Sequence, residues 1–253
     1  MLKHIKKCTE AEAQRLLGND SWSLHLEELD AFVALLYVRG ALGARCIEVD
    51  ELWSKKWGAP FFTDTKSRNR FRKILKYLCF DEKNTRSECL KSDKFALIST
   101  TWNHFIENCQ LNYIPGSNVT VDKQLFPSRT RCPYLEYMPN KPDKFGIKFW
   151  LLADVETKYL CNGFPYVGKN KQRAPNGKLP EQVVMKLVAP YRNKGQNVTT
   201  DNFFTTVTLG ERLVKEKTSL VGTINHARKE IPNTIKKNEN SSLYVCSLEK
   251  ERW

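Results

Sequence analysis

Two aspartates stand alone in segments rich in β-forming residues. Asp122 follows Val-Thr-Val in residues 118–126, and Asp201 follows Val-Thr-Thr in residues 197–204. A buried carboxylate without a partner is costly, so two such acids on separate strands suggest that they hold a divalent metal ion together. Two-metal sites of this kind carry out phosphoryl transfer, usually with a third acid, and no convincing third acid follows here. A lone aspartate at a strand end is also a common turn or capping residue, and this alternative stays open.

The elements around these acids are predicted to form an α/β fold. Apolar patterning and turn signals indicate, in order, strands at 119–126, 146–154 and 159–167, a helix at 180–191, a strand at 197–201, a helix at 206–216 and a strand at 219–224. This order is the succession of a ribonuclease-H-like mixed sheet. A right-handed crossover would place strand 197–201 parallel to strand 119–126 and beside it.

The predicted neighbours bring the two acids together. Adjacent strands lie about 4.8 Å apart, so the carboxylates of Asp122 and Asp201 are expected close to each other. Side chains alternate along a strand, so Lys123 is expected on the face opposite Asp122 and therefore turned away from the metal site.

Residues before Pro115 show helical rather than strand periodicity. Helices are predicted at 23–39, 65–78 and 94–111. The second of these carries a basic face, which includes Arg68, Arg70, Arg72 and Lys73. Such a face is typical either of a helix that lies along a phosphate backbone or of an ordinary solvated helix surface, and the residues alone leave both open.

Composition narrows the classes of partner. The 253 residues carry a formal charge of +13, with 41% hydrophobic residues. This charge favours an anionic polymer, most simply nucleic acid, over an anionic membrane surface. No stretch is long and apolar enough to span a membrane. The eight cysteines form no Cys-x-x-Cys pair, so a structural zinc is not expected. A small-molecule cofactor is not expected either.

Several longer motifs resemble the piggyBac family of DNA transposases. They include Val121-Asp-Lys-Gln-Leu125, Tyr137-Met-Pro-Asn-Lys-Pro142, Asn162-Gly-Phe-Pro-Tyr166 and Thr200-Asp-Asn-Phe-Phe-Thr205. The resemblance covers about residues 28 to 232, and the Pro-Asn-Lys-Pro and Asp-Asn-Phe-Phe blocks occur in the family's order.

The resemblance implies a function and a domain plan. Family members cut DNA at element ends and rejoin it at TTAA targets, using a ribonuclease-H-like core, three aspartates and Mg²⁺ (or Mn²⁺). The first two aspartates fall on Asp122 and Asp201. Residues 1–115 would form a helical domain for dimerisation and DNA binding, residues 116–218 the first part of the catalytic core, and residues 219–253 the start of a β-rich insertion. A homodimer in the nucleus is the corresponding expectation.

Two departures from the family qualify this expectation. Lys123 stands where the family usually has an acid, and the third aspartate is expected beyond Trp253, since neither Asp154 nor Glu230 is suitably placed. We therefore expect either a fragment or a shortened derivative of a transposase. The alternative is a domesticated, catalytically inactive DNA-binding or interaction protein derived from one.

A second group of basic residues follows the first strand. It comprises Arg129, Arg131, Lys141, Lys144 and Lys148. Beside a cleavage site these residues are expected to contact DNA phosphates. The alternative is a solvated, proline-rich connection without a partner.

Overall fold

The computed structural model describes residues 1–139, 141–168, 178–225, 228–229 and 243–248. The chain forms two compact units, Met1–Phe105 and Ile106–Trp253. The division falls inside helix α7 (Ala96–Asn112), a little before the boundary predicted near Pro115. Among the helices described here, none combines the length and the apolar character that crossing a bilayer requires.

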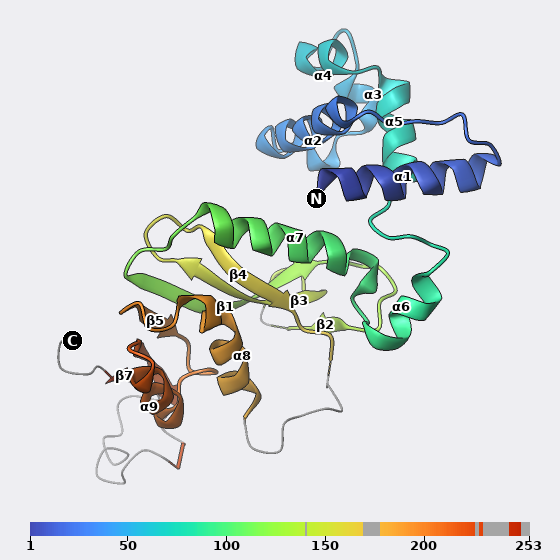
Figure 1. The fold of residues 1–253 in the computed structure, drawn as a ribbon. Coiled ribbons are helices and arrows are strands. Elements are labelled where there is room, and N and C mark those ends of the chain that lie inside the picture. The colour runs from blue at the N-terminus through green and yellow to red at the C-terminus, as the bar shows by residue number, and fades with distance from the viewer. Residues whose placement is uncertain (140, 169–177, 226–227, 230–242, 249–253) are drawn as a thin grey trace. The chain divides into compact units, whose positions relative to one another are not determined.

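The first unit is helical (Figure 1). Its helices are α1 (Leu2–Leu17), α2 (Leu26–Ala41), α3 (Val49–Leu52), α4 (Pro60–Thr65), α5 (Arg68–Tyr77) and α6 (Arg86–Ser92), with a 3-10 turn at Ala44–Cys46. Aromatic rings fill its core: Trp53 lies 4.8 Å from Phe71 and 5.2 Å from Phe62 between ring centroids. The helices predicted at 23–39, 65–78 and 94–111 are present as α2, α5 and α7, whereas α1, α3, α4 and α6 were not predicted.

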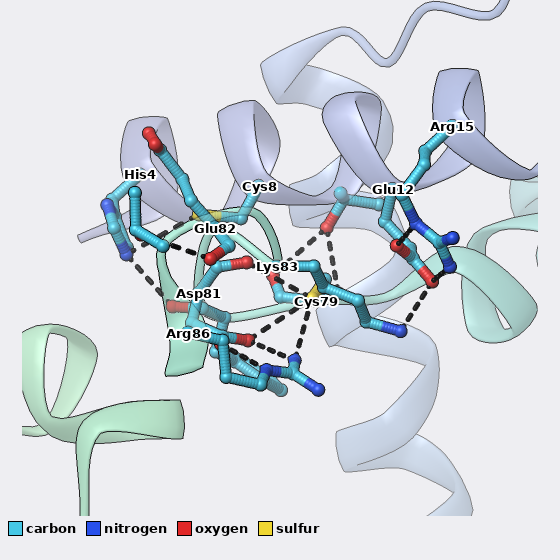
Figure 2. Close-up of polar contacts among 12 residues, drawn as sticks. His4, Cys8, Glu12, Arg15, Cys79, Asp81, Glu82, Lys83 and Arg86 are labelled. Carbon is cyan, nitrogen blue, oxygen red and sulfur yellow. Dashed lines mark hydrogen bonds and ion pairs between the residues drawn. The ribbon is translucent and has the colours of Figure 1, made fainter. Parts of the chain in front are cut away.

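Charged side chains fix α1 to the segment that follows α5, as Figure 2 shows. Glu12, whose side chain is only 7% exposed, accepts hydrogen bonds from Lys83 (2.6 Å) and Arg15 (2.9 Å). Nearby, Arg86 donates to both carboxylate oxygens of Asp81 at 2.6 Å. Removing one member of a buried ion pair leaves the other uncompensated, so loss of Glu12 or of Lys83 alone is expected to destabilise the unit.

A second charged cluster joins α2 to α5. Glu28 on α2 accepts hydrogen bonds from the Arg70 guanidinium on both carboxylate oxygens, at 2.9 and 2.7 Å. It also accepts one from Lys66 at 3.1 Å. The Arg70 guanidinium also lies over the Trp22 ring, 4.8 Å from its centroid. Arg70 is therefore held by contacts within the helical unit.

The second unit is built on one mixed sheet. Its strands are β1 (Asn118–Pro127), β2 (Leu135–Tyr137), β3 (Phe145–Asp154), β4 (Leu160–Pro165), β5 (Asn197–Thr200), β6 (Ser219–Asn225) and β7 (Leu243–Leu248). The strand order is β2-β3-β1-β5-β6-β7, and β4 also pairs with β3. Strand β1 is antiparallel to β3 and parallel to β5, and β5 is parallel to β6. The predicted ribonuclease-H-like mixed sheet and the parallel crossover are thus confirmed.

Helices α8 (Leu179–Val188) and α9 (Val207–Lys215) cover one face of this sheet. Alternate residues of the strands point toward them, so that Val119, Val121, Trp150, Leu152, Val198 and Leu220 share one core with both helices. Strand β6 continues this sheet beside β5, and the core therefore extends past residue 218, where the insertion was expected to begin.

Candidate active site

The two predicted aspartates lie on neighbouring parallel strands, Asp122 in the middle of β1 and Asp201 directly after β5. The last pair in the β1–β5 register is Val121 with Thr200, so Asp122 and Asp201 are the next residues of the two strands. Asp122 is exposed, and the Asp201 side chain is 35% exposed. Neither carboxylate is buried in the apolar core.

A tight turn fixes the Asp201 carboxylate. Its Oδ1 accepts hydrogen bonds from the backbone N–H groups of Phe203 (3.0 Å) and Phe204 (3.3 Å). Phe204 is fully buried in the core, and the ring of Phe203 stacks on that of Trp150 at 5.7 Å. The prediction that these phenylalanines anchor the core rather than form a base-stacking surface agrees with this packing.

Lys123 does not turn away from the site. Its backbone position pairs with Trp150, so its Cβ points to the core face, opposite Asp122, as strand alternation predicts. Its side chain nevertheless reaches Asp201, where Nζ lies 2.9 Å from Oδ2. The expectation that Lys123 is turned away from the site is therefore wrong, because a lysine stem is long enough to pass the end of β5.

These residues do not fit a divalent ion as they are arranged. Asp201 Oδ1 accepts a hydrogen bond from the turn, and Asp201 Oδ2 pairs with the Lys123 ammonium. Asp122 Oδ1 accepts the backbone N–H of Lys123 at 2.7 Å. Magnesium demands an octahedral shell of oxygen ligands, and a positive side chain opposes it. Within the described ranges, no group of three or more His, Cys, Asp or Glu residues is placed to hold a metal.

Asp154 has a structural role elsewhere in the sheet. Asp154 pairs with Val119, whereas Asp122 pairs with Leu151 on the same strand as Asp154. Asp154 and Leu151 are three residues apart on β3, which corresponds to about 10 Å along the strand. Its carboxylate accepts backbone N–H groups from Thr157, Gly116 and Glu156, and these bonds lower the pKa of Asp154. Asp154 is thus the cap of the β3–β4 turn. Glu230 lies outside the described residues.

Comparison with known proteins places this geometry in a family. A family profile described as "Transposase IS4" matches residues 1–250. A chain of the piggyBac transposase, solved by cryo-EM in a synaptic complex with hairpin DNA, is 33% identical to this one and matches it with a TM-score of 0.86. The match covers 95% of this chain and 51% of that one. The chain belongs to the piggyBac-type transposase family. It spans about half the length of the solved piggyBac chain.

The basic residues predicted to contact DNA differ in their exposure and in the ion pairs that they form. On α5, Arg68 and Arg72 are about half exposed and share Asp50, at 3.1 and 2.9 Å. Surface pairs of this kind are weak and exchange readily for phosphate contacts. Arg70 is engaged by Glu28, as described above, and Lys73 is exposed. Beyond β1, Arg129, Arg131 and Lys144 are exposed, whereas Lys141 is partly buried.

Lys148 is held by aromatic rings, one of which belongs to Phe203 in the turn after Asp201. Its ammonium lies 4.1 Å from the Trp150 ring centroid, 4.9 Å from that of Tyr166 and 5.8 Å from that of Phe203. Burial lowers the pKa of Lys148 below that of a free lysine. This packing makes Lys148 a support for the Phe203 turn. Its position in the sequence of β3 did not predict this role.

Arg228 is a second site residue to which sequence reasoning gave no role. Its guanidinium donates to the carbonyl oxygens of Asn202 (3.1 Å) and Phe203 (3.2 Å), in the turn after Asp201. No local pattern could have found it, since it lies more than twenty residues along the chain from that turn.

Gly222 is required for the close packing behind Asp201. A Cβ at this position would lie 2.3 Å from Thr205 Oγ1 and 2.6 Å from the Thr200 carbonyl oxygen. Because a backbone oxygen cannot swing aside, we expect Gly222→Ala to lower the free energy of unfolding by about 1–3 kcal/mol, measured by urea denaturation. Gly40→Ala on α2 is the control, since an added Cβ meets nothing within 4 Å and should be stabilising. Equal stability of Gly222→Ala and the wild type would contradict this account.

Proposed function

We propose that this chain is part of a DNA transposase that cleaves double-stranded DNA and joins it to TTAA targets. The observation that carries the proposal is the parallel register of β1 and β5, in which Asp122 and Asp201 each follow the last paired residues, Val121 and Thr200. The family membership supports it, as does the synaptic complex with hairpin DNA in which the similar piggyBac transposase was solved.

The proposed chemistry depends on Mg²⁺ or Mn²⁺. Asp122 and Asp201 would supply two carboxylates, and a third acid would complete the site. Asp122 and Asp201 would hold the ion, and it would supply activation of the attacking oxygen and stabilisation of the leaving one. Lys123 must release Asp201 before both carboxylates are available. A nuclear location and a homodimer complete the proposal.

DNA is proposed to bind along exposed basic residues. Arg129 and Arg131 follow β1 directly and lie in the same unit as Asp122. Arg68 and Arg72 offer a second basic surface in the helical unit, where both already contact the same aspartate. Each arginine that neutralises a phosphate releases counterions, so the contacts are measurable as salt dependence.

We expect the double variant Arg129→Ala/Arg131→Ala to bind a duplex containing TTAA more weakly and with less dependence on salt. Two lost phosphate contacts should reduce the slope of log K against log salt by about 1.8. Fluorescence anisotropy of a labelled duplex, repeated across a series of NaCl concentrations, measures both quantities.

The matched control removes the same charge from another surface. Lys186→Ala/Lys215→Ala takes one exposed lysine from α8 and one from α9. If this control lowers the slope as much as the arginine variant does, binding follows net charge and the proposed contact surface is wrong.

A second function is favoured by one observation. The Lys123–Asp201 ion pair opposes metal binding, as expected for a transposase-derived protein that binds DNA or another partner without cutting. A nicking assay separates the two functions. DNA binding without nicking in either Mg²⁺ or Mn²⁺ would favour this second function.

A further inference from the structure

A positive side chain occupies the side of Asp201 that faces β1. The Lys123 ammonium lies 2.9 Å from Asp201 Oδ2 and 4.8 Å from the centroid of the Phe203 ring. An anionic oxygen and the face of an aromatic ring both attract a cation. The site is therefore built to hold one positive charge that the chain itself supplies.

The surrounding fold keeps Lys123 in this place. Its backbone is fixed within the β1–β3 ladder opposite Trp150, and only 24% of its side chain is exposed. Phe203, over which the ammonium lies, stacks on the Trp150 ring with an interplanar angle of 13°. Arg228 holds the same turn through the Phe203 carbonyl oxygen. The lysine thus lies against a rigid aromatic surface rather than in open solvent.

We propose that Lys123 is an internal cation that competes with divalent metal for Asp201. The pair Asp122 and Asp201 carries two negative charges, and Lys123 reduces the local charge to −1. A divalent ion that enters must displace the ammonium from Oδ2 or bind beside it against its repulsion. The inference rests on the proposed function only in taking Asp122 and Asp201 as the metal ligands. It predicts that the wild-type chain binds metal weakly because of Lys123.

The test measures binding of Mn²⁺ alone, without DNA and without any activity assay. Mn²⁺ is titrated into the full chain and the free ion is followed by electron paramagnetic resonance. Lys123→Met keeps a long side chain over Phe203 and removes the charge, so its Mn²⁺ affinity is expected to rise about tenfold or more. Lys123→Gln, which removes the charge with a polar side chain, should give the same increase.

Two further variants identify the cause. Lys123→Arg keeps the positive charge and should therefore not bind Mn²⁺ more tightly than the wild type. Lys123→Met/Asp201→Asn removes the ligand as well as the charge and should lose the gain. Thermal unfolding of each variant verifies that it is folded.

The outcomes separate this inference from the proposed function. Mn²⁺ affinity that is unchanged in Lys123→Met and Lys123→Gln would overturn the inference, whatever a nicking assay shows. A gain that persists in Lys123→Met/Asp201→Asn would also overturn it, since the metal would then bind elsewhere. Tighter Mn²⁺ binding in a chain that never nicks DNA would uphold the inference and count against the proposed function.

Discussion

Asp201→Asn is expected to lower Mg²⁺-dependent nicking of a duplex carrying an element end by about 10³-fold, and Asp122→Asn to do the same. A bound metal contributes several kcal/mol of transition-state stabilisation, and about 4 kcal/mol corresponds to about 10³ in rate. Asparagine keeps the acceptor oxygen that the Phe203 N–H needs, and it suits a turn of this type. The variant therefore changes charge with little change of backbone. Single-turnover nicking, resolved on denaturing gels, measures the rate.

The control for this prediction is Glu156→Gln, an exposed residue in the β3–β4 turn, which should nick at the wild-type rate. DNA affinity is measured in parallel, because loss of binding alone would also reduce nicking. Wild-type nicking that both aspartate variants retain would remove these two residues from the active site. A wild type without detectable nicking would instead support the non-cleaving, DNA-binding function.

The sheet could be predicted from the sequence because most of its strands have a recognisable local residue pattern. Runs of apolar and β-branched residues bounded by turn signals marked β1, β3 and β5, and the handedness of crossovers then placed β5 parallel to β1. That topology is what brings Asp122 and Asp201 to neighbouring positions. By contrast, β2 has three residues in a proline-rich connection, too few to show any period.

Long polar side chains explain what sequence reasoning missed. Helix α1 buries Thr9 and Glu12 beside its apolar residues. The sequence of its buried face is therefore not a continuous hydrophobic stripe. The partners that make this burial possible include Lys83, which is distant in the chain. Lys123 shows the same effect at the active site. Alternation predicts where its Cβ points, but the position of the ammonium depends on Asp201 and Phe203 in another segment.

Glu12→Gln is expected to destabilise the helical unit by about 3 kcal/mol at pH 7. Hydrogen bonds from Arg15 and Lys83 lower the pKa of Glu12 to about 2, from an ordinary value of 4.5, and each unit corresponds to about 1.4 kcal/mol. The contribution is present above pH 4.5 and is lost as pH falls through about 2. The pKa of Glu28 is also lowered to about 2, chiefly by Arg70, and its partly exposed side chain implies a smaller loss of about 2 kcal/mol for Glu28→Gln.

Urea denaturation at pH 7 and at pH 2.5, followed by circular dichroism, measures these losses. Because the wild type loses the same interactions in acid, the difference between wild type and Glu12→Gln should shrink sharply at pH 2.5. Glu88→Gln is the matched control, since its side chain is 80% exposed and pairs only with Lys91, a contact worth less than about 1 kcal/mol. A Glu12→Gln loss of equal size at both pH values would assign the effect to packing. The charged cluster would then not be what attaches α1 to the rest of the helical unit.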